Sequence, residues 1–262
     1  MAMIGGLLDQ IQPDASDEED DEEPDIDFAF EANGAGEAAS SCRAVVVCNP
    51  GAATAFALGT LSLEPVAWKL DFVKERPLRA FPPPPKPPRF YLARGSNGAT
   101  VAVAVLEGPI PADLASAWAE ALLKGFSADA EVLFLDRVFR AGFCVHGHEE
   151  RPVEPHLCGL WTAAWGGEGP HSLGSLARFM APNVIEGLGA ALLTQCEAER
   201  RRCLVALTLQ DGAHLGISCV RAFSGLAPLL QDIGLLPSDW SPPDYAEVVR
   251  QVVPPPSMAI YA

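Results

Sequence analysis

Short, continuous runs of apolar residues alternate along this chain with stretches whose apolar positions follow a helical period. Such runs are typical of strands covered on both faces, as in the centre of a parallel sheet. Three of them stand at 43–49 (RAVVVCN), 131–136 (EVLFLD) and 203–209 (CLVALTL). Helical patterns at 52–61 and 111–125 lie between the first two, which indicates that helices connect neighbouring strands.

The stretch from 182 to 230 predicts a helix, a strand, a turn and a second helix. Asn183 is a favourable N-cap and Glu186 stands at the capping-box position, so we expect the first helix to begin there. Asp211 and Gly212 predict the turn after the strand at 203–209. The apolar residues of the first helix recur every four positions and share one face: Val184, Leu188, Leu192 and Cys196.

We therefore predict an α/β fold, namely a single three-layer domain over residues 42–253 with a largely parallel central sheet flanked by helices. The apolar segments at 90–93 and 100–106 enclose a Gly-Ser-Asn-Gly sequence at 95–98, which predicts a hairpin within this domain. A proline-rich insertion at 77–89 is expected to be extended and exposed.

Charge is distributed unevenly along the chain. Residues 1–41 contain 13 acidic side chains and no lysine or arginine, which predicts a disordered acidic N-terminal tail. The remaining residues include 21 acidic and 18 basic side chains, so most of the net charge of −16 belongs to the tail. A nearly neutral body argues against a nucleic-acid partner, because such proteins require a basic face.

The seven cysteines are odd in number, and no pair has the CxxC spacing. Most stand inside apolar runs, which favours buried thiols in a reducing compartment over a disulfide framework. The N-terminus lacks the basic segment of a secretory signal, and no apolar run reaches the ~20 residues that cross a bilayer. We expect a cytoplasmic protein, with the nucleus as an additional location, and no membrane partner.

A cluster of metal-binding residue types lies in the segment 141–165, but its spacing matches no structural zinc pattern. Loop and strand-end positions are the simpler interpretation, so we predict neither a metal nor a cofactor. The cluster consists of Cys144, His146, His148, His156 and Cys158.

Signatures of catalysis are sparse. Neither the dinucleotide fingerprint GxGxxG nor the P-loop pattern follows the first strand, and Ser172 has no GxSxG context. The alternative to a non-enzymatic role is an α/β enzyme or small-molecule-binding protein that uses the strand-end residues Asn49, Asp136 and Asp211. A generic scaffold that binds through its proline-rich and acidic segments is a third possibility.

The C-terminal segment 254–262 begins with three prolines, which prevent the preceding helix from continuing. We expect an extended tail that ends in Ile260, Tyr261 and Ala262. An apolar tip held away from its own core is suited to a groove of another protein, where the tyrosine ring is buried and the terminal carboxylate pairs with a donor. A frayed terminus is the simpler alternative.

The C-terminal hydrophobic–Tyr–any tripeptide resembles the docking tails of proteasome activators and assembly chaperones. The body resembles the proteasome core particle assembly chaperone family in patches that keep their order over about a third of the chain. An acidic N-terminal tail agrees with this resemblance, whereas the segments 82–88 and 141–165 have no counterpart. The matching positions are Asn49, Ala55-Phe56-Ala57-Leu58, Pro182-Asn183, Ala190-Ala191, Cys196, Asp211, Ser218, Ala222-Phe223 and Leu226.

The resemblance implies a chaperone without enzymatic activity that forms a heterodimer with a second, related assembly chaperone. The pair would hold proteasome α subunits while these form a ring. The tail would insert between neighbouring α subunits: Ile260 would fill an apolar pocket, Tyr261 would pack and hydrogen-bond, and the Ala262 carboxylate would meet a lysine.

Overall fold

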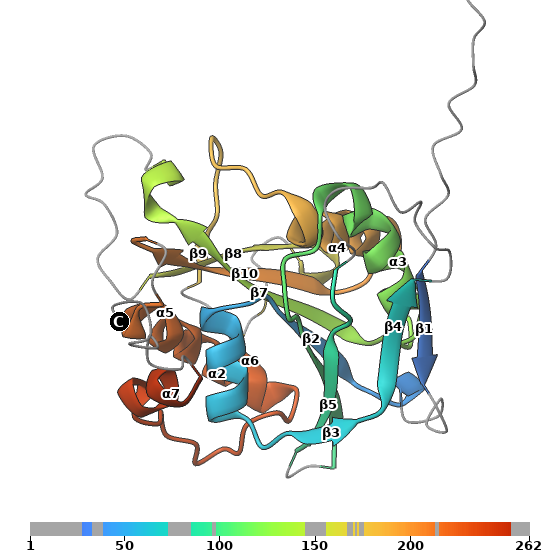
Figure 1. Cartoon of the computed structure of the whole chain (residues 1–262), viewed down its shortest axis with the longest axis horizontal. Coiled ribbons are helices and arrows are strands. Elements are labelled where there is room, and N and C mark those ends of the chain that lie inside the picture. The colour runs from blue at the N-terminus through green and yellow to red at the C-terminus, as the bar shows by residue number, and fades with distance from the viewer. Residues whose placement is uncertain are drawn as a thin grey trace, which may run out of the picture.

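A computed structural model describes residues 28–32, 39–72, 85–95, 98–144, 156–166, 170, 172, 176–212 and 215–252. Within these residues an eight-stranded sheet forms the middle layer of the molecule, in the order β3-β5-β6-β2-β7-β10-β8-β9 (Figure 1). The predicted tail at 254–262 lies outside the described residues, as does most of the predicted acidic tail and of the proline-rich insertion.

Four parallel strands occupy the centre of the sheet, and they confirm the prediction of a largely parallel centre. They are β6 (Thr100–Val105), β2 (Ala44–Cys48), β7 (Glu131–Phe139) and β10 (Cys203–Gln210). Antiparallel pairing extends the sheet through β5 (Arg89–Arg94) and β3 (Glu64–Val66) on one side, and through β8 (Leu157–Trp161) on the other. The edge strand β9 (Ala177–Arg178) runs parallel to β8.

Successive residues of the central strands belong to two separate cores, one on each face of the sheet. Val45 and Phe134 lie in one core, whereas Val46 and Leu135 lie in the other, and all four are buried. Complete burial of such a side chain contributes ~1.5–3 kcal/mol to stability. The continuous apolar runs of the sequence therefore reflect strands that are covered on both sides.

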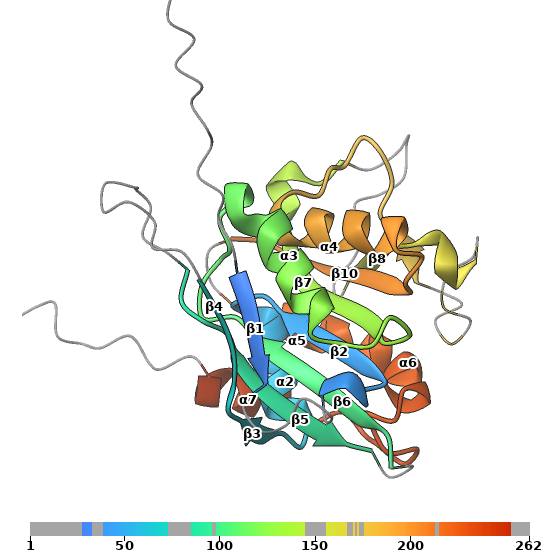
Figure 2. The ribbon, with the colours of Figure 1, turned by 90° about the vertical axis from the view of Figure 1, so that its right-hand side faces the viewer.

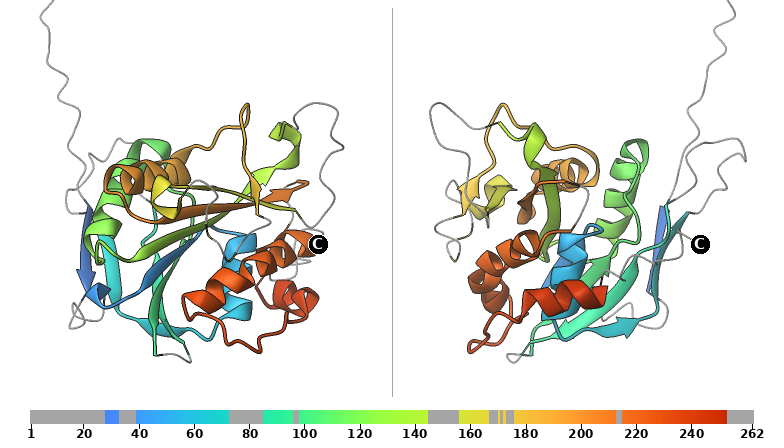
Figure 3. Two further views of the ribbon diagram at one scale, coloured as in Figure 1. Left: turned by 180° about the vertical axis from the view of Figure 1, so that it is seen from behind. Right: turned by 60° about the vertical axis from the view of Figure 1, so that its left-hand side comes forward.

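Helices cover both faces of the sheet, which confirms the predicted three layers (Figures 1 and 3). One face carries α3 (Ala115–Lys124), which continues the turn η1 (Ala112–Leu114), and α4 (Gly187–Ala198). The other face carries α2 (Ala52–Thr60), α5 (Ile217–Ala222), η5 (Phe223–Leu226), α6 (Ala227–Asp232) and α7 (Tyr245–Val252). Among the described helices, none is long and apolar enough to cross a membrane.

The path of the chain creates a switch point between β2 and β7. From β2 the chain proceeds to β6 on one side, and it then crosses back through α3 to β7 on the other side of β2. In open α/β sheets, ligands commonly bind beyond the carboxyl ends of two strands that are connected in opposite directions. The ends of β2 and β7 are therefore the first candidate position for a ligand site.

A small second sheet pairs β1 (Phe28–Ala32) with β4 (Trp68–Phe72) in antiparallel register. Phe30 of β1 packs its ring against Trp68, Phe90 and Phe126, at centroid distances of 5.9, 5.5 and 5.3 Å. The expected tail of residues 1–41 overlaps this strand. Aromatic residues that follow the acidic block supply the apolar surface that the block itself lacks.

Helix α4 begins later than its sequence pattern predicts. Its N-cap position is Glu186, without a capping side-chain bond, whereas Asn183 exchanges hydrogen bonds with the backbone of Cys144. Val184 is 74% exposed and precedes the helix, so the capping box and the position of Val184 on the apolar face were wrong. The predicted residues Leu188, Leu192 and Cys196 are buried as expected.

The C-terminal end of α4 has a defined backbone motif. Arg200 adopts a left-handed conformation with φ of 57°. The amide of Arg201 donates to the carbonyl of Cys196 at 2.8 Å, and the amide of Arg200 donates to that of Glu197 at 3.2 Å. This is a Schellman arrangement, which turns the chain sharply from α4 into β10.

Candidate functional site

Two of the predicted strand-end residues lie together where β2 ends, although Asp136 stands inside β7, three residues before its last residue Phe139. The side-chain amide of Asn49 donates a hydrogen bond of 2.7 Å to Oδ1 of Asp136. The same oxygen accepts the backbone amide of Arg137, also at 2.7 Å. The pairing of β2 with β7 sets this geometry, because Cys48 lies opposite Leu135 and the next residue of each strand carries the polar side chain.

Burial dominates the electrostatics of Asp136. Desolvation raises the pKa of its carboxyl above the ordinary value of 3.8, although the hydrogen bonds from Asn49 and Arg137 and the charge of Arg137 act in the opposite direction. A catalytic base is often tuned in this way, but a buried structural carboxylate has the same signature. The pKa direction therefore does not identify a catalytic group.

The Arg137 side chain covers the space beyond this pair. One of its terminal nitrogens donates to Oε1 of Gln210 at 3.3 Å, and its guanidinium lies 5.5 Å from the ring of Phe139. The same nitrogen approaches Gly51, where a Cβ atom would lie only 2.6 Å away. Gly51, which precedes α2, has a φ of +109°, a conformation that favours glycine, and a side chain there would also displace the end of Arg137.

Asp211 does not join the Asn49–Asp136 pair directly. It follows β10, and its Oδ1 forms an ion pair with Nε of Arg140 at 2.8 Å. Arg140 begins the short turn η2 (Arg140–Gly142) after β7. The three predicted residues thus lie along one edge of the sheet, and each is engaged by a neighbouring protein group.

The Cys/His-rich segment contains residues in different environments. Cys158 is buried in β8 and its thiol donates to the carbonyl of Leu207 at 3.6 Å, whereas Cys144 is exposed. The ring of His156 packs on Phe143 at 5.9 Å, and burial lowers the pKa of this histidine. His146 and His148 lie outside the described residues, and within the described part no three ligand side chains converge on a metal position.

The seven cysteines carry no disulfide, and all of them lie in the described part of the chain. Six are buried. Burial raises the pKa of Cys42 to about 11 and of Cys48 and Cys158 to about 12, so these thiols stay protonated at neutral pH. Their environment is that of small apolar core residues rather than of nucleophiles or metal ligands.

A second polar cluster lies at the opposite edge of the sheet, where the central strands begin. Arg43 precedes β2, Glu131 begins β7 and Arg202 precedes β10, and backbone hydrogen bonds of 3.0 and 2.8 Å connect these positions. Arg202 forms an ion pair with Oε1 of Glu131 at 3.2 Å, and its guanidinium lies 5.4 Å from the ring of Trp165. Trp165 belongs to the turn η3 (Ala163–Trp165) after β8.

These residues line a cavity of about 270 Å³ together with Ser172 and the α6 region, from which Leu229, Asp232 and Ile233 contribute. Sequence reasoning missed this site because Glu131 stands in an otherwise apolar run that predicts only a strand. The available signal was a charged residue at or just before the start of each of three parallel strands.

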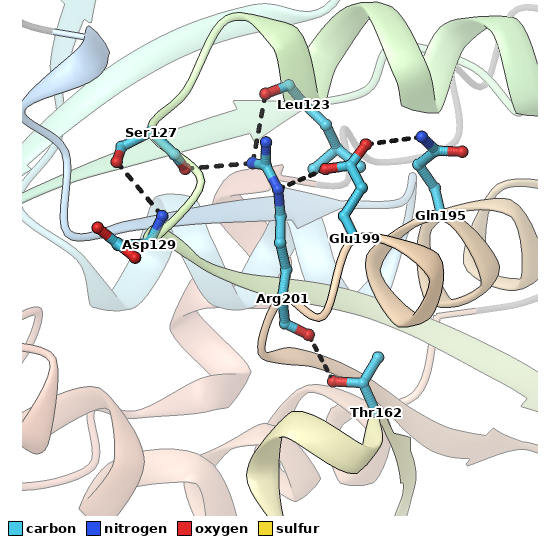
Figure 4. A network of polar contacts seen from close by, with 7 residues as sticks. All are labelled: Leu123, Ser127, Asp129, Thr162, Gln195, Glu199 and Arg201. Atoms are coloured by element: carbon cyan, nitrogen blue, oxygen red, sulfur yellow. Dashed lines mark hydrogen bonds and ion pairs between the residues drawn. The ribbon is translucent and has the colours of Figure 1, made fainter.

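A nearly buried arginine side chain holds the framework of this edge in place (Figure 4). The Arg201 side chain is 9% exposed and donates to the carbonyls of Leu123 and Ser127 at 3.3 and 3.1 Å. Its Nε contacts the Glu199 carboxylate at 2.6 Å, and its own carbonyl accepts the Thr162 hydroxyl at 2.7 Å. One residue thus connects the ends of α3, α4 and β8.

The predicted docking residues Ile260, Tyr261 and Ala262 lie outside the described residues, so their role stays a prediction. The helix that precedes them is well anchored, because Tyr245 and Val248 of α7 are buried. Close helix packing explains the glycine opposite: a Cβ at Gly59 of α2 would lie 2.3 Å from Cγ1 of Val248.

Comparison with protein-family models found no match, and comparison with curated proteins found none either. Solved structures do match. PbaA of Pyrococcus furiosus, an archaeal homolog of proteasome-assembly chaperone, is 17% identical with a TM-score of 0.51, over 87% of this chain and 89% of that chain. PbaB of the same organism, an archaeal proteasome activator, is 11% identical with a TM-score of 0.54, over 86% of this chain and 94% of that chain.

A protein of unknown function from Thermoplasma acidophilum is 16% identical with a TM-score of 0.54, over 85% of this chain and 89% of that chain. All three matches extend over most of both chains, so the similarity concerns the whole domain rather than a common strand–helix unit. The three-layer domain of this chain therefore has the fold of these archaeal proteins.

Proposed function

We propose that this protein is a non-enzymatic chaperone for assembly of the proteasome core particle. It acts as a heterodimer with a second, related assembly chaperone and promotes formation of the α ring. The supporting observation is that a fold shared with PbaA and PbaB covers at least 86% of a chain that ends in a hydrophobic–Tyr–any tripeptide. The fold and the tripeptide are independent features of the chain, and both suggest the same class of partner.

The proposed mechanism combines docking of the folded body with insertion of the tail. The body lies on the ring face, and the tail enters a groove between neighbouring α subunits. Ile260 fills an apolar pocket, Tyr261 buries its ring while its hydroxyl keeps a hydrogen bond, and the Ala262 carboxylate pairs with a lysine.

The anchoring of α7 on the body supports a mechanism in which the body docks and the tail inserts. A tail of nine residues at ~3.1 Å each reaches roughly 28 Å when extended, and it starts from a helix fixed on the body by Tyr245 and Val248. Once the body has docked, the tail acts at high effective concentration, so a weakly binding tripeptide still contributes to the complex.

Isolation of the tagged protein with its complexes tests the proposal. We expect proteasome α subunits and a second chaperone-like subunit among the partners. Tyr261→Ala should weaken recovery of α subunits by about tenfold or more, as expected for loss of an aromatic anchor. Met258→Ala, in the same tail but outside the tripeptide, is the matched control and should leave recovery unchanged.

A truncation after Ala259 distinguishes the role of the tail from that of the body. It should retain the heterodimer and weaken α-subunit binding at least as much as Tyr261→Ala does, because only the tripeptide is removed. Equal recovery of α subunits by the truncated and full-length proteins would rule out the docking role of the tail. Absence of α subunits from every preparation of the full-length protein would rule out the proposed function itself.

The proposal places the protein in the cytoplasm and also in the nucleus. The many protonated core thiols suit a reducing environment. Imaging of the tagged protein tests this location, and a signal confined to an oxidising compartment would contradict it.

A further inference from the structure

Helix α7 is the last described element of the body, and the proposed docking tail follows it in the sequence. It lies against α2 and α5 (Figures 1 and 2). One side of the helix is polar and exposed, with an ion pair of 2.8 Å between Arg250 and Glu247. The other side attaches the helix to the body through apolar residues that are buried or half-buried: Tyr245, Val248, Val249 and Val252.

Gly59 of α2 allows α7 to approach this closely. A Cβ at this position would lie 2.3 and 2.7 Å from the two methyl carbons of Val248, and 3.0 Å from its Cβ. Rotation of the Val248 side chain would not remove the overlap, because the Cβ does not move in that rotation. Any larger residue at position 59 therefore requires α7 itself to move.

The backbone does not explain this glycine. Gly59 is the last residue but one of α2, and its φ is not positive. Glycine inside a helix is less favourable than alanine, because it loses more conformational freedom on folding. The close contact with Val248 offsets this loss, so the glycine serves the attachment of α7.

The position of α7 determines where the tail begins. The helix ends at Val252, and three prolines follow at 254–256. Proline-rich segments are extended and semi-rigid, so the orientation of α7 sets the direction in which the tail leaves the body. Without the attachment of α7, the tether would start after Leu236, the last buried residue before the helix. It would lengthen from the 10 residues 253–262 to the 26 residues 237–262.

We propose that Gly59 is a positioning residue for the C-terminal tail. It lets Val248 pack against α2, and the attached α7 fixes the origin and the direction of the tail. The inference rests on the proposed docking function of the tail. The effective concentration of a tethered group falls roughly as the −3/2 power of the tether length, so release of α7 should lower the apparent affinity for α subunits roughly fourfold.

Amide hydrogen exchange of the full-length protein tests the attachment of α7. An isolated helix of eight residues is not stable in water, so α7 unfolds when it detaches. The Val248 amide, which donates to the carbonyl of Asp244 at 3.1 Å, should exchange at least about tenfold faster in Gly59→Val. The amides of β2 and β7 should be unaffected. Gly108→Val, where an added Cβ meets no described atom within 4 Å, is the matched control and should leave α7 protected.

Titration of proteasome α subunits with the tagged protein tests the consequence for docking. Gly59→Val should lower the apparent affinity roughly fourfold, and Gly108→Val should leave it unchanged. In the truncation after Ala259, Gly59→Val should cause no further loss, because the tripeptide that α7 positions is absent. A merely structural role of Gly59 would instead weaken the full-length and the truncated protein equally.

Three results would overturn the inference: unchanged exchange of α7 in Gly59→Val, unchanged affinity of this variant, or an equal loss of affinity in the full-length and truncated proteins. In each case the natural protein still binds α subunits, so the chaperone proposal stands. If the natural protein bound no α subunits, the chaperone proposal and the positioning role would fail together. The exchange data would then still decide whether Gly59 holds α7 on the body.

Discussion

Strand β7 carries a carboxylate near each end, and the two differ in how far the protein satisfies them. Asp136, at the switch point, receives hydrogen bonds from Asn49 and from the Arg137 backbone. Glu131, where the strand begins, is more deeply buried and has Oε2 without a donor in the described residues. The carboxylate at the carboxyl edge is thus satisfied by neighbouring groups, while the one at the amino edge has an oxygen without a donor among the described residues.

This difference shows why position in a fold is a weak guide to function. The carboxyl ends of β2 and β7 meet the topological criterion for a ligand site in an α/β sheet. However, Arg137 reaches across to Gln210 and lies against Gly51, so the local side chains use this space for contacts among themselves. The hydrogen bonds that each carboxylate receives distinguish the two edges better than topology does.

The largest expected effect concerns the framework of the amino edge. Arg201→Met should lower the free energy of unfolding by about 3 kcal/mol, because two backbone carbonyls and the Glu199 carboxylate lose a nearly buried partner. Urea unfolding of the purified protein measures the change. A loss as small as that of an ordinary surface variant would show that this edge is held by packing alone.

Arg250→Met is the matched control for this substitution. Arg250 lies on α7 with 69% of its side chain exposed, and it pairs with Glu247 one turn earlier. Surface ion pairs of this kind contribute little, so the change should stay within about 0.5 kcal/mol.

A smaller effect is expected at the carboxyl edge. Asn49→Ala removes one hydrogen bond to the partly buried Asp136 carboxylate and should cost about 2 kcal/mol in urea unfolding. The cost should shrink when Asp136 is also replaced by Asn, because the bond then no longer involves a charge. An unchanged cost in the double variant would show that Asn49 acts through its own turn rather than through Asp136.

Most of the fold follows from local patterns in the sequence. The apolar runs at 43–49, 131–136 and 203–209 predict β2, β7 and β10 to within a few residues, because strands buried on two faces leave few polar positions. The hairpin prediction is also confirmed, since β5 and β6 pair antiparallel around Gly95 and Gly98.

The remaining elements depend on tertiary contacts that no local pattern reveals. Asn183 has the chemistry of a helix cap, yet it binds the Cys144 backbone 39 residues away. Because Asn183 is engaged in this contact, α4 begins several residues later in the sequence than predicted. Strand β8 lies in a segment that was interpreted from its cysteines and histidines, so its short run LCGLW was not predicted as a strand. Glu131 illustrates the same limit for the site, because its significance depends on Arg202 and Trp165 from distant segments.

The smallest expected effect is also the most specific, and it concerns pH. Burial raises the pKa of Asp136 in the folded state, so the folded protein binds its proton more tightly than the unfolded chain does. The carboxylate therefore costs stability above its folded-state pKa, and this cost disappears as the pH falls below the ordinary value of 3.8. Asp136→Asn keeps an oxygen that accepts from Asn49 and Arg137, and it does not titrate.

The stability of this variant relative to the natural protein should therefore be highest at neutral pH and should decline as the pH is lowered. Urea unfolding at a series of pH values measures the difference, and Asp239→Asn at an exposed position controls for the change in net charge. A relative stability that instead rises on acidification would mean that the hydrogen bonds to Asp136 outweigh its desolvation. In that case the hydrogen bonds at the carboxyl edge stabilise the charged form of Asp136. The difference in hydrogen bonding between the two edges is then larger than the raised pKa indicates.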